Sequence, residues 1–236
     1  AWKEQTIANT SEAQFKVEFE CEFLGSVNTL INPSKLRNLV YEDPIKRNAG
    51  LDIYQDPIEE HNYLMTVDVA RGLGNDYSAF IVFDITEFPY KVVGKYRNNE
   101  IKPMLFPNII HEVAKAYNDA WLLVEVNDIG DQVANILHFD LEYENVLMCA
   151  MRGRAGQIVG SGFSGKKSQL GVRMTAAVKK LGCSNLKTLL EDDKLLTVDY
   201  EIQYIVWYRQ NKILFVDQYR ELLRSFQKQI KYFLLA

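Results

Sequence analysis

An apolar run that carries a single acid near its end is the feature that most constrains how this chain can fold. Residues 63–70 are almost wholly apolar and strand-like, yet Asp68 stands near their end. A glycine-rich turn follows at residues 72–75, and a second apolar run occupies residues 78–84. Such a charge is costly unless it is paired, hydrated or bound to a metal. The hairpin therefore predicts either a metal ligand or a surface acid at the end of an edge strand.

Composition places the chain among soluble globular proteins. Of its 236 residues, 47% are hydrophobic and 25% are charged, which suits one domain of ordinary to large size. The longest apolar stretches have the length of strands, so no transmembrane helix and no membrane partner are predicted. Three widely spaced cysteines offer neither a disulfide framework nor a zinc knuckle, which favours reduced thiols in a cytosolic compartment.

The apolar periodicity predicts an alternation of strands and helices. Short links between the first three strands favour an antiparallel meander. The order β-β-β-α-β-α-β indicates an α/β fold, with a mixed β-sheet flanked by helices. Strands are expected at residues 63–70, 78–85, 90–96, 120–126 and 145–150, helices at 107–117, 130–141 and 168–181, and a polar connector at 42–60.

The strand at residues 120–126 repeats the pattern of a lone acid, because Glu125 stands near its end. Two strands of one sheet that each end in a carboxylate can place both acids at the same edge. Mg²⁺ prefers oxygen ligands, and two such ions about 3.5–4 Å apart can activate a water and stabilise the leaving oxygen of a phosphodiester. Asp68 and Glu125 are therefore predicted to be metal ligands. The alternative is that Glu125 pairs with an Arg or a Lys.

Positive charge is concentrated in one stretch, although the formal net charge of the whole chain is −4. Residues 151–180 contain seven Lys and Arg residues and no Asp or Glu, a local field that suits a polyanion. Residues 151–167 are rich in glycine and are expected to form a mobile loop that tracks DNA, the alternative being a merely solvated loop. The predicted DNA-binding residues are Arg152, Arg154, Lys166, Lys167 and Arg173.

These motifs resemble the C-terminal nuclease domain of the large terminase subunit of tailed bacteriophages, in particular the T-even-like group. The resemblance covers roughly residues 12–202, and it implies a ribonuclease-H-like fold, whose element order is the one predicted above. It rests on residues 65–72 with Asp76, on the element formed by Glu125, Asn127 and Gly130, and on residues 181–194.

The resemblance also implies a function. Such a domain would be a Mg²⁺- or Mn²⁺-dependent endonuclease that cuts concatemeric double-stranded DNA with little sequence specificity by two-metal hydrolysis. Its partners would be an ATPase domain in the same full-length chain, the portal and the small terminase subunit, in the host cell cytoplasm at the prohead. No complete phosphate-binding loop of the form GxxxxGK[ST] occurs here. Residues 1–60 are thus interpreted as an N-terminal segment and linker from an absent ATPase domain, and residues 61–236 as the nuclease domain.

The family's third catalytic acid is the point at which this chain departs from the resemblance. That acid belongs to an Asp-Asp pair opening the last helix, and residues 203–236 contain no such pair. Asp217 is the best remaining ligand, although it could equally be a helix cap. Asp192 and Asp193 are expected in a solvent-facing turn. Two alternatives stay open: a non-catalytic docking module that binds the portal or a partner protein, and a transposase- or resolvase-type nuclease of the same fold.

Overall fold

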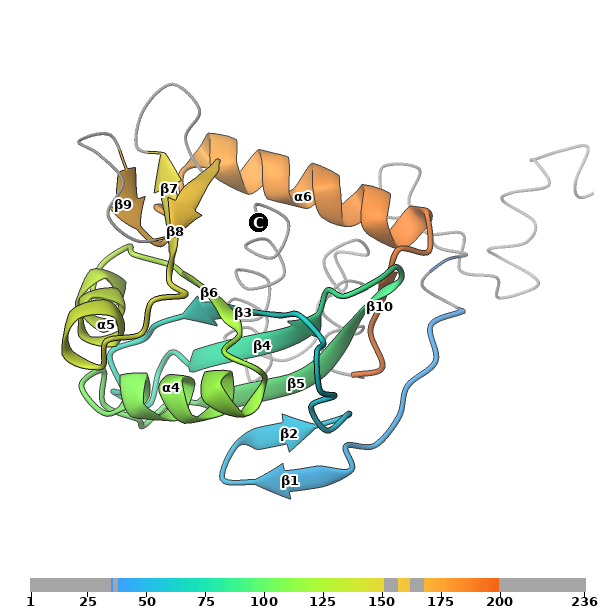
Figure 1. The fold of residues 1–236 in the computed structure, drawn as a ribbon, viewed down its shortest axis with the longest axis horizontal. Helices are drawn as coiled ribbons and strands as arrows, with labels where there is room; N and C mark the ends of the chain where they lie inside the picture. Colours follow the sequence, from blue (N-terminus) through green and yellow to red (C-terminus); the bar gives the residue numbers. More distant parts are fainter. Residues whose placement is uncertain (1–34, 36–37, 151–156, 162–167, 200–236) are drawn as a thin grey trace, which may run out of the picture.

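Helices enclose a mixed β-sheet from both sides in the computed structural model, which describes residues 35, 38–150, 157–161 and 168–199 (Figure 1). The strands of this sheet lie in the order β1-β2-β5-β4-β3-β6, and β10 pairs with β5. In the described ranges, no helix is both long and apolar enough to cross a membrane. The strands are β1 (Lys46–Asn48), β2 (Leu51–Ile53), β3 (Tyr63–Asp68), β4 (Ser78–Asp84), β5 (Tyr90–Asn98), β6 (Trp121–Val124) and β10 (Leu195–Leu196).

The centre of the sheet confirms the predicted meander. Strand β4 pairs antiparallel with both β3 and β5, whereas β6 returns parallel to β3 after crossing over through helix α4 (Phe106–Ala116). Every residue of β3 and β4 is buried, because both faces of the sheet are covered. This double burial explains why the sequence of both strands reads as a nearly continuous apolar run.

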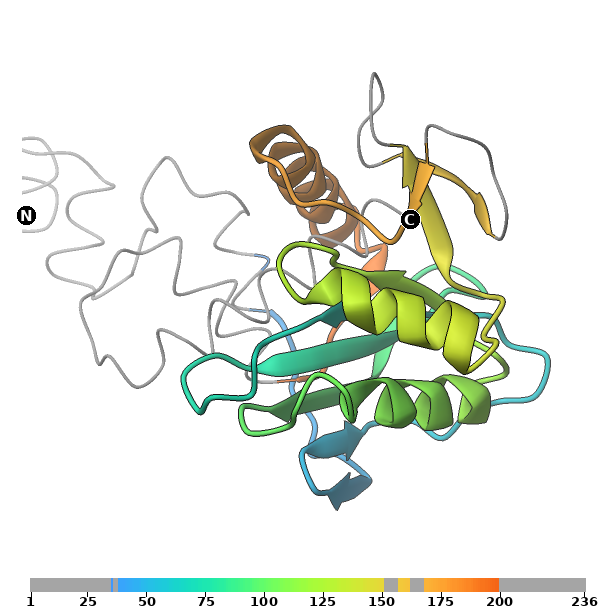
Figure 2. The ribbon, with the colours of Figure 1, turned by 90° about the vertical axis from the view of Figure 1, so that its left-hand side faces the viewer.

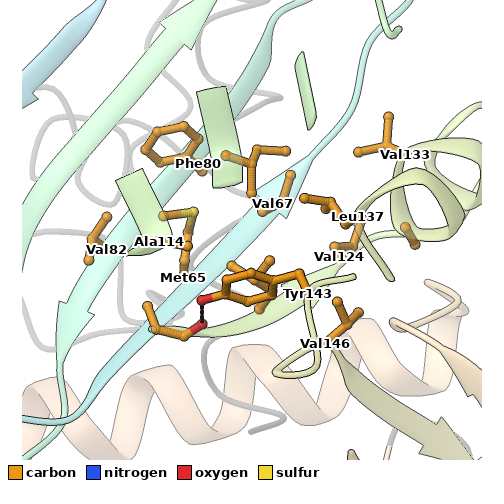
Figure 3. Packing of buried hydrophobic residues seen from close by; sticks show 14 of the residues in the cluster. Met65, Val67, Phe80, Val82, Ala114, Val124, Val133, Leu137, Tyr143 and Val146 are labelled. Carbon is orange, nitrogen blue, oxygen red and sulfur yellow. Dashed lines mark hydrogen bonds between the residues drawn. The ribbon is translucent and has the colours of Figure 1, made fainter. Parts of the chain in front are cut away.

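Two separate cores fill the two sides of the sheet (Figures 1 and 2). Helices α4 and α5 (Gly130–Asn135), with the π-helical turn η1 (Ile136–Asp140), cover one face. Figure 3 shows side chains of β3 and β4 in this core together with Ala114 of α4 and Val133 of α5. The Tyr143 hydroxyl donates there to the Ala120 carbonyl at 2.7 Å. Helix α6 (Ala176–Glu191) covers the other face through Val178, Leu186 and Leu190.

A second, three-stranded sheet was not predicted. Strand β7 (Leu147–Ala150) matches the expected strand at 145–150, but it pairs antiparallel with β8 (Ile158–Ser161) and β9 (Ser168–Leu170). The prediction of a mobile loop throughout residues 151–167 is therefore wrong for β8, while residues 151–156 and 162–167 lie outside the described residues. Strand β8 forms because it pairs with β7. This pairing is a non-local effect, so the glycine-rich composition of the segment does not reveal it.

The helix expected at residues 168–181 was placed too early. Gly171 interrupts the pattern with φ +68°, and a Cβ there would stand 2.2 Å from the Val124 carbonyl oxygen, so only glycine fits this close approach. Helix α6 begins five residues later, where the Thr175 side chain accepts a hydrogen bond from the Val178 N–H at 3.3 Å. It ends at Glu191, and Asp192 and Asp193 lie in the exposed turn expected of them.

Strands β1 and β2 form a hairpin within residues 42–60, which were expected to be a polar connector. Strand β2 pairs antiparallel with β5, and β1 with β2, so the hairpin extends the sheet at its edge. All three residues of β1 are exposed, and such a polar edge strand carries little of the apolar alternation by which strands are recognised.

A buried ion pair fastens the last described residues to the sheet. The Lys95 ammonium on β5 lies 2.5 Å from the Asp199 carboxylate and 3.4 Å from that of Asp52 on β2. The Tyr54 hydroxyl also donates to Asp199. Because buried charges are tolerated only when paired and hydrogen-bonded, this cluster holds the segment after β10 against β2 and β5.

We predict that the Asp84 carboxylate stabilises the fold in a pH-dependent way. Burial acts to raise the pKa of Asp84, but hydrogen bonds from Thr86 and from His61, whose Nδ1 lies 2.7 Å from Oδ2, outweigh it and hold this pKa below its ordinary value. A lowered folded-state pKa gives stability that is complete above the unfolded-state pKa and is lost as pH falls through the folded-state pKa. Asp84→Asn should lower the free energy of unfolding at pH 7 by about 1–2 kcal/mol.

Urea unfolding of both proteins across the acidic range measures this effect. The difference between wild type and Asp84→Asn should shrink in acid, below the ordinary range of an aspartate. Glu87→Gln, which removes an exposed acid three residues away, is the matched control and should change stability little at any pH. A difference for Asp84→Asn that stays constant down to strong acid would contradict the prediction.

Candidate metal site

The two predicted acids meet at one rim of the large sheet. Strands β3 and β6 are parallel neighbours whose register pairs Thr66 with Leu123 and Val67 with Val124. The Glu125 N–H donates to the Val67 carbonyl at 2.9 Å, which carries the pairing past the end of β6. Asp68 and Glu125 are thus neighbouring residues at the carboxyl ends of adjacent strands, where ligands commonly bind in α/β sheets.

Both acids also lie on the same face of the sheet. Side chains alternate along a strand, and Leu64 and Leu123, which lie an even number of residues before Asp68 and Glu125, belong to the core beneath α6. Asp68 and Glu125 are only 3% and 5% exposed, yet both line one cleft of about 290 Å³. The cleft is also lined by Arg71, Asp76, Asn127 and Asp128.

An ion pair joins the two turns that follow the acids. Arg71 stands three residues after Asp68, and Asp128 stands three residues after Glu125. The Arg71 guanidinium donates from Nε and Nη2 to the two carboxylate oxygens of Asp128, at 2.9 and 2.5 Å. This fork-shaped hydrogen bonding is the main reason that the pKa of Asp128 is lowered. Because both Asp128 oxygens are engaged, Asp128 is a cross-link between the turns in this arrangement.

The turn after Asp68 is also fastened to the segment after β5. A Cβ on Gly72, whose φ is +65°, would stand 2.2 Å from the Ile101 carbonyl oxygen. The Lys102 ammonium donates to the Gly72 carbonyl at 3.1 Å, and the Asn99 side chain donates to the Gly74 carbonyl at 2.8 Å. The glycine-rich turn recognised in the sequence is therefore anchored along one wall of the cleft.

The Glu125, Asn127 and Gly130 element has a structural explanation for each residue. A Cβ on Gly130 would lie 1.8 Å from the Glu125 carbonyl oxygen, so glycine permits α5 to begin directly against the acid-bearing strand. The Asn127 amide accepts from the Met174 N–H at 2.8 Å and donates to the Met174 carbonyl at 3.1 Å. Asn127 thus reproduces a backbone-like pairing that ties the turn to the start of α6.

Of the predicted DNA-binding residues, the structure describes only Arg173. Arg173 is exposed and lies between two attachments to the acid-bearing turn: Val172 bridges to Glu125, and Met174 is held by Asn127. The structure therefore brings Arg173 to the rim beside Glu125. Arg152, Arg154, Lys166, Lys167 and Asp217 lie outside the described residues.

The donor set fits a hard divalent cation. Two buried carboxylates open onto a cleft with room for water and phosphate oxygens, and Mg²⁺ is typically held by one or two carboxylates together with such oxygens. Across residues 38–150, 157–161 and 168–199, no three His, Cys, Asp or Glu side chains come together closely enough to hold a metal ion. The described part of the chain thus contributes a pair of acids.

Comparisons with known proteins agree with this architecture. The sequence model of a family described as "Terminase RNaseH-like domain" matches residues 65–210, which is more than half of the chain. Two crystal structures of the large terminase nuclease from thermophilic phage G20c are similar. The form with bound magnesium has 17% identity and a TM-score of 0.60, and the form with bound cobalt has 18% and 0.59. Each comparison covers 87% of this chain and 97% of that chain.

The large terminase nuclease domain of Thermus phage P74-26 is also similar, with 18% identity and a TM-score of 0.55 over 86% of this chain and 94% of that chain. At such identities the likeness shows the fold. The expected ribonuclease-H-like mixed sheet flanked by helices is confirmed.

We predict that Asn127→Asp destabilises the protein by about 1–3 kcal/mol, because a carboxylate cannot donate to the Met174 carbonyl and would face its oxygen. Urea unfolding at neutral pH measures the loss. Asn75→Asp adds the same charge at an exposed position of the same cleft and should cost less than about 0.5 kcal/mol. Equal losses in the two variants would mean that added charge, rather than the Met174 contacts, causes the effect.

Proposed function

The chain belongs to the terminase RNaseH-like domain family, and from this membership we propose that it is the metal-dependent DNA endonuclease domain of a viral DNA-packaging terminase. One observation carries the proposal: Asp68 and Glu125, 57 residues apart in the chain, lie side by side on one face at one rim of the sheet. The magnesium- and cobalt-bound forms of the G20c nuclease support a divalent cation as the partner of these acids.

The residues of the cleft suit phosphodiester hydrolysis. Divalent cations bound there would lower the pKa of an attacking water and offset charge on the leaving oxygen. Asp68 and Glu125 would hold them in a fixed position, because each stands at the end of a buried strand. The Arg71–Asp128 pair would keep the two acid-bearing turns at a constant separation. A cleft built in this way positions its acids before the substrate arrives, which favours catalysis.

Asp217 is proposed as the third ligand on the strength of the family resemblance. Strand β5 ends at the rim that carries Asp68, and β10 runs parallel to β5. Strand β10 therefore also runs toward that rim. The last described residue, Asp199, is held on β5 by Lys95. This course supports a third acid that reaches the site from the C-terminal part of the sequence.

The remaining features are proposed by analogy with the family. They are the C-terminal position behind an ATPase domain, membership of the T-even-like group, action on concatemeric double-stranded DNA, partnership with the portal and the small subunit, and work in the host cell cytoplasm at the prohead. Mg²⁺ or Mn²⁺ is the proposed metal. Low sequence preference is proposed because basic side chains that grip phosphates carry no base information.

We expect Asp68→Asn and Glu125→Gln each to reduce the rate of cutting by more than about a hundredfold. The loss of a metal ligand should exceed the loss caused by removing a residue that only orients a ligand. Nicking of supercoiled plasmid in Mg²⁺ or Mn²⁺ measures the activity, and EDTA should abolish it. Glu112→Gln, an exposed exchange on α4, is the matched control and should cut normally. Full cleavage by either site variant, with its fold intact by circular dichroism, would defeat the assignment.

Calorimetric titration with Mn²⁺ separates the nuclease from a docking module that lacks a complete metal site. The nuclease should bind the ion, and Asp68→Asn should weaken that binding whether or not DNA is present. Wild-type protein that neither binds Mn²⁺ nor nicks plasmid would favour the docking module.

A further inference from the structure

The rim that carries the two acids continues onto β4 and β5, where it presents a basic residue. The register pairs Asp68 of β3 with Ala79 of β4, and Ala79 with Arg97 of β5. Directly paired residues on antiparallel strands project from the same face. Glu125, Asp68, Ala79 and Arg97 therefore form one row across four strands on the face beneath α6.

The Arg97 side chain is held toward this rim. Its guanidinium carbon lies 4.6 Å from the centroid of the Tyr77 ring, and Tyr77 comes immediately before β4. The Arg97 N–H donates to the Gly50 carbonyl at 2.9 Å, which fixes the backbone against the tip of the β1–β2 hairpin. A Cβ on Gly50 would stand 2.4 Å from the Arg97 carbonyl oxygen, so the hairpin tip packs directly on this residue.

The negative charge of the cleft explains why a basic residue such as Arg97 would help to bind DNA. Among the residues that the structure describes, the cleft is lined by the four acids Asp68, Asp76, Glu125 and Asp128 and by one guanidinium, that of Arg71, which is engaged by Asp128. A phosphate chain would be repelled by this surplus of negative charge unless cations accompany it. Metal ions held by Asp68 and Glu125 would compensate inside the cleft, but the flanking phosphates of a bound strand would need fixed positive charge outside it. Arg97 stands two strands from Asp68, about 10 Å at the usual spacing of neighbouring strands.

We propose that Arg97, positioned by the Tyr77 ring, binds a backbone phosphate of the DNA strand that enters the Asp68–Glu125 cleft. This inference rests on the proposed function. Ala79 lies between Arg97 and Asp68 in this row, and because its side chain is small and fully buried it places no protruding group between them. The planar guanidinium can donate two parallel hydrogen bonds to one phosphate, a geometry that an ammonium lacks. Arg97 is half-buried and its guanidinium lies over the Tyr77 ring, so this side chain loses little conformational freedom on binding.

Fluorescence anisotropy with a labelled DNA duplex, in EDTA so that no cutting occurs, tests the contact. Arg97→Gln should weaken binding and lower the slope of log affinity against log salt by about one unit, the signature of one lost phosphate contact. Lys91→Gln removes the same charge from an exposed position toward the other end of β5 and should leave the slope unchanged. Arg97→Lys should keep the slope but bind more weakly than wild type, because the fork is lost.

The outcomes separate this inference from the proposed function. If wild type nicks plasmid and both Arg97 variants bind DNA as wild type does, the phosphate contact is refuted while the nuclease stands. If wild type does not nick in any divalent metal, the nuclease fails, and the anisotropy still decides the contact. Thermal unfolding accompanies each measurement. Should Arg97→Gln not fold, Arg97→Lys decides, and wild-type affinity in that variant overturns the proposal.

Discussion

The parallel pairing of β3 with β6 is the interaction on which the site depends. Its register sets Thr66 beside Leu123, and the hydrogen bond from the Glu125 N–H to the Val67 carbonyl extends it to the acids themselves. A slip of one residue in either strand would send one carboxylate to the opposite face. Apolar side chains on both faces of both strands oppose that slip, because each side chain would move from the core on one face to the core on the other and would disrupt the packing of both.

Glu125 is fixed from both sides, which explains how an acid can stand so deep in the sheet. On one side lies β3, and on the other Val172 forms a parallel bridge with Glu125 and exchanges hydrogen bonds with Val124 and Val126 at 2.8 and 3.0 Å. The Glu125 N–H, the Val124 carbonyl and the Val126 N–H are therefore all paired, and Glu125 lines the cleft. The close approaches that require Gly130 and Gly171 follow from this crowding, since each meets a carbonyl of the β6 segment.

The sequence predicts the parts of this molecule that depend on local pattern. A buried strand appears in the sequence as an apolar run. Strands β3, β4 and β6, and the acids at their ends, could therefore be predicted from the sequence. Strand β8 and the start of α6 could not be predicted, because both depend on partners distant in the chain. Strand β8 forms by pairing with β7, and the close approach to the Val124 carbonyl requires glycine at position 171, before α6 begins. Asn127 was recognised only as part of a motif, since its partner Met174 lies 47 residues away. Arg97 carries no sequence signal, because only the register across two strands relates it to Asp68.

The rim has a consistent electrostatic order from one side to the other. The segment that bears Arg173 lies beyond β6, the two acids occupy the ends of β6 and β3, and Arg97 follows on β5 beyond the small Ala79. In the proposed complex, an extended phosphate chain that crosses the rim would meet positive charge before and after the acids, and metal ions at the acids. Fixed cations on both sides would hold the strand while the central phosphate sits at the metals. Attraction confined to the basic stretch at 151–180 would anchor the DNA from one side only, and this difference makes Arg97 the informative residue for how the substrate lies in the cleft.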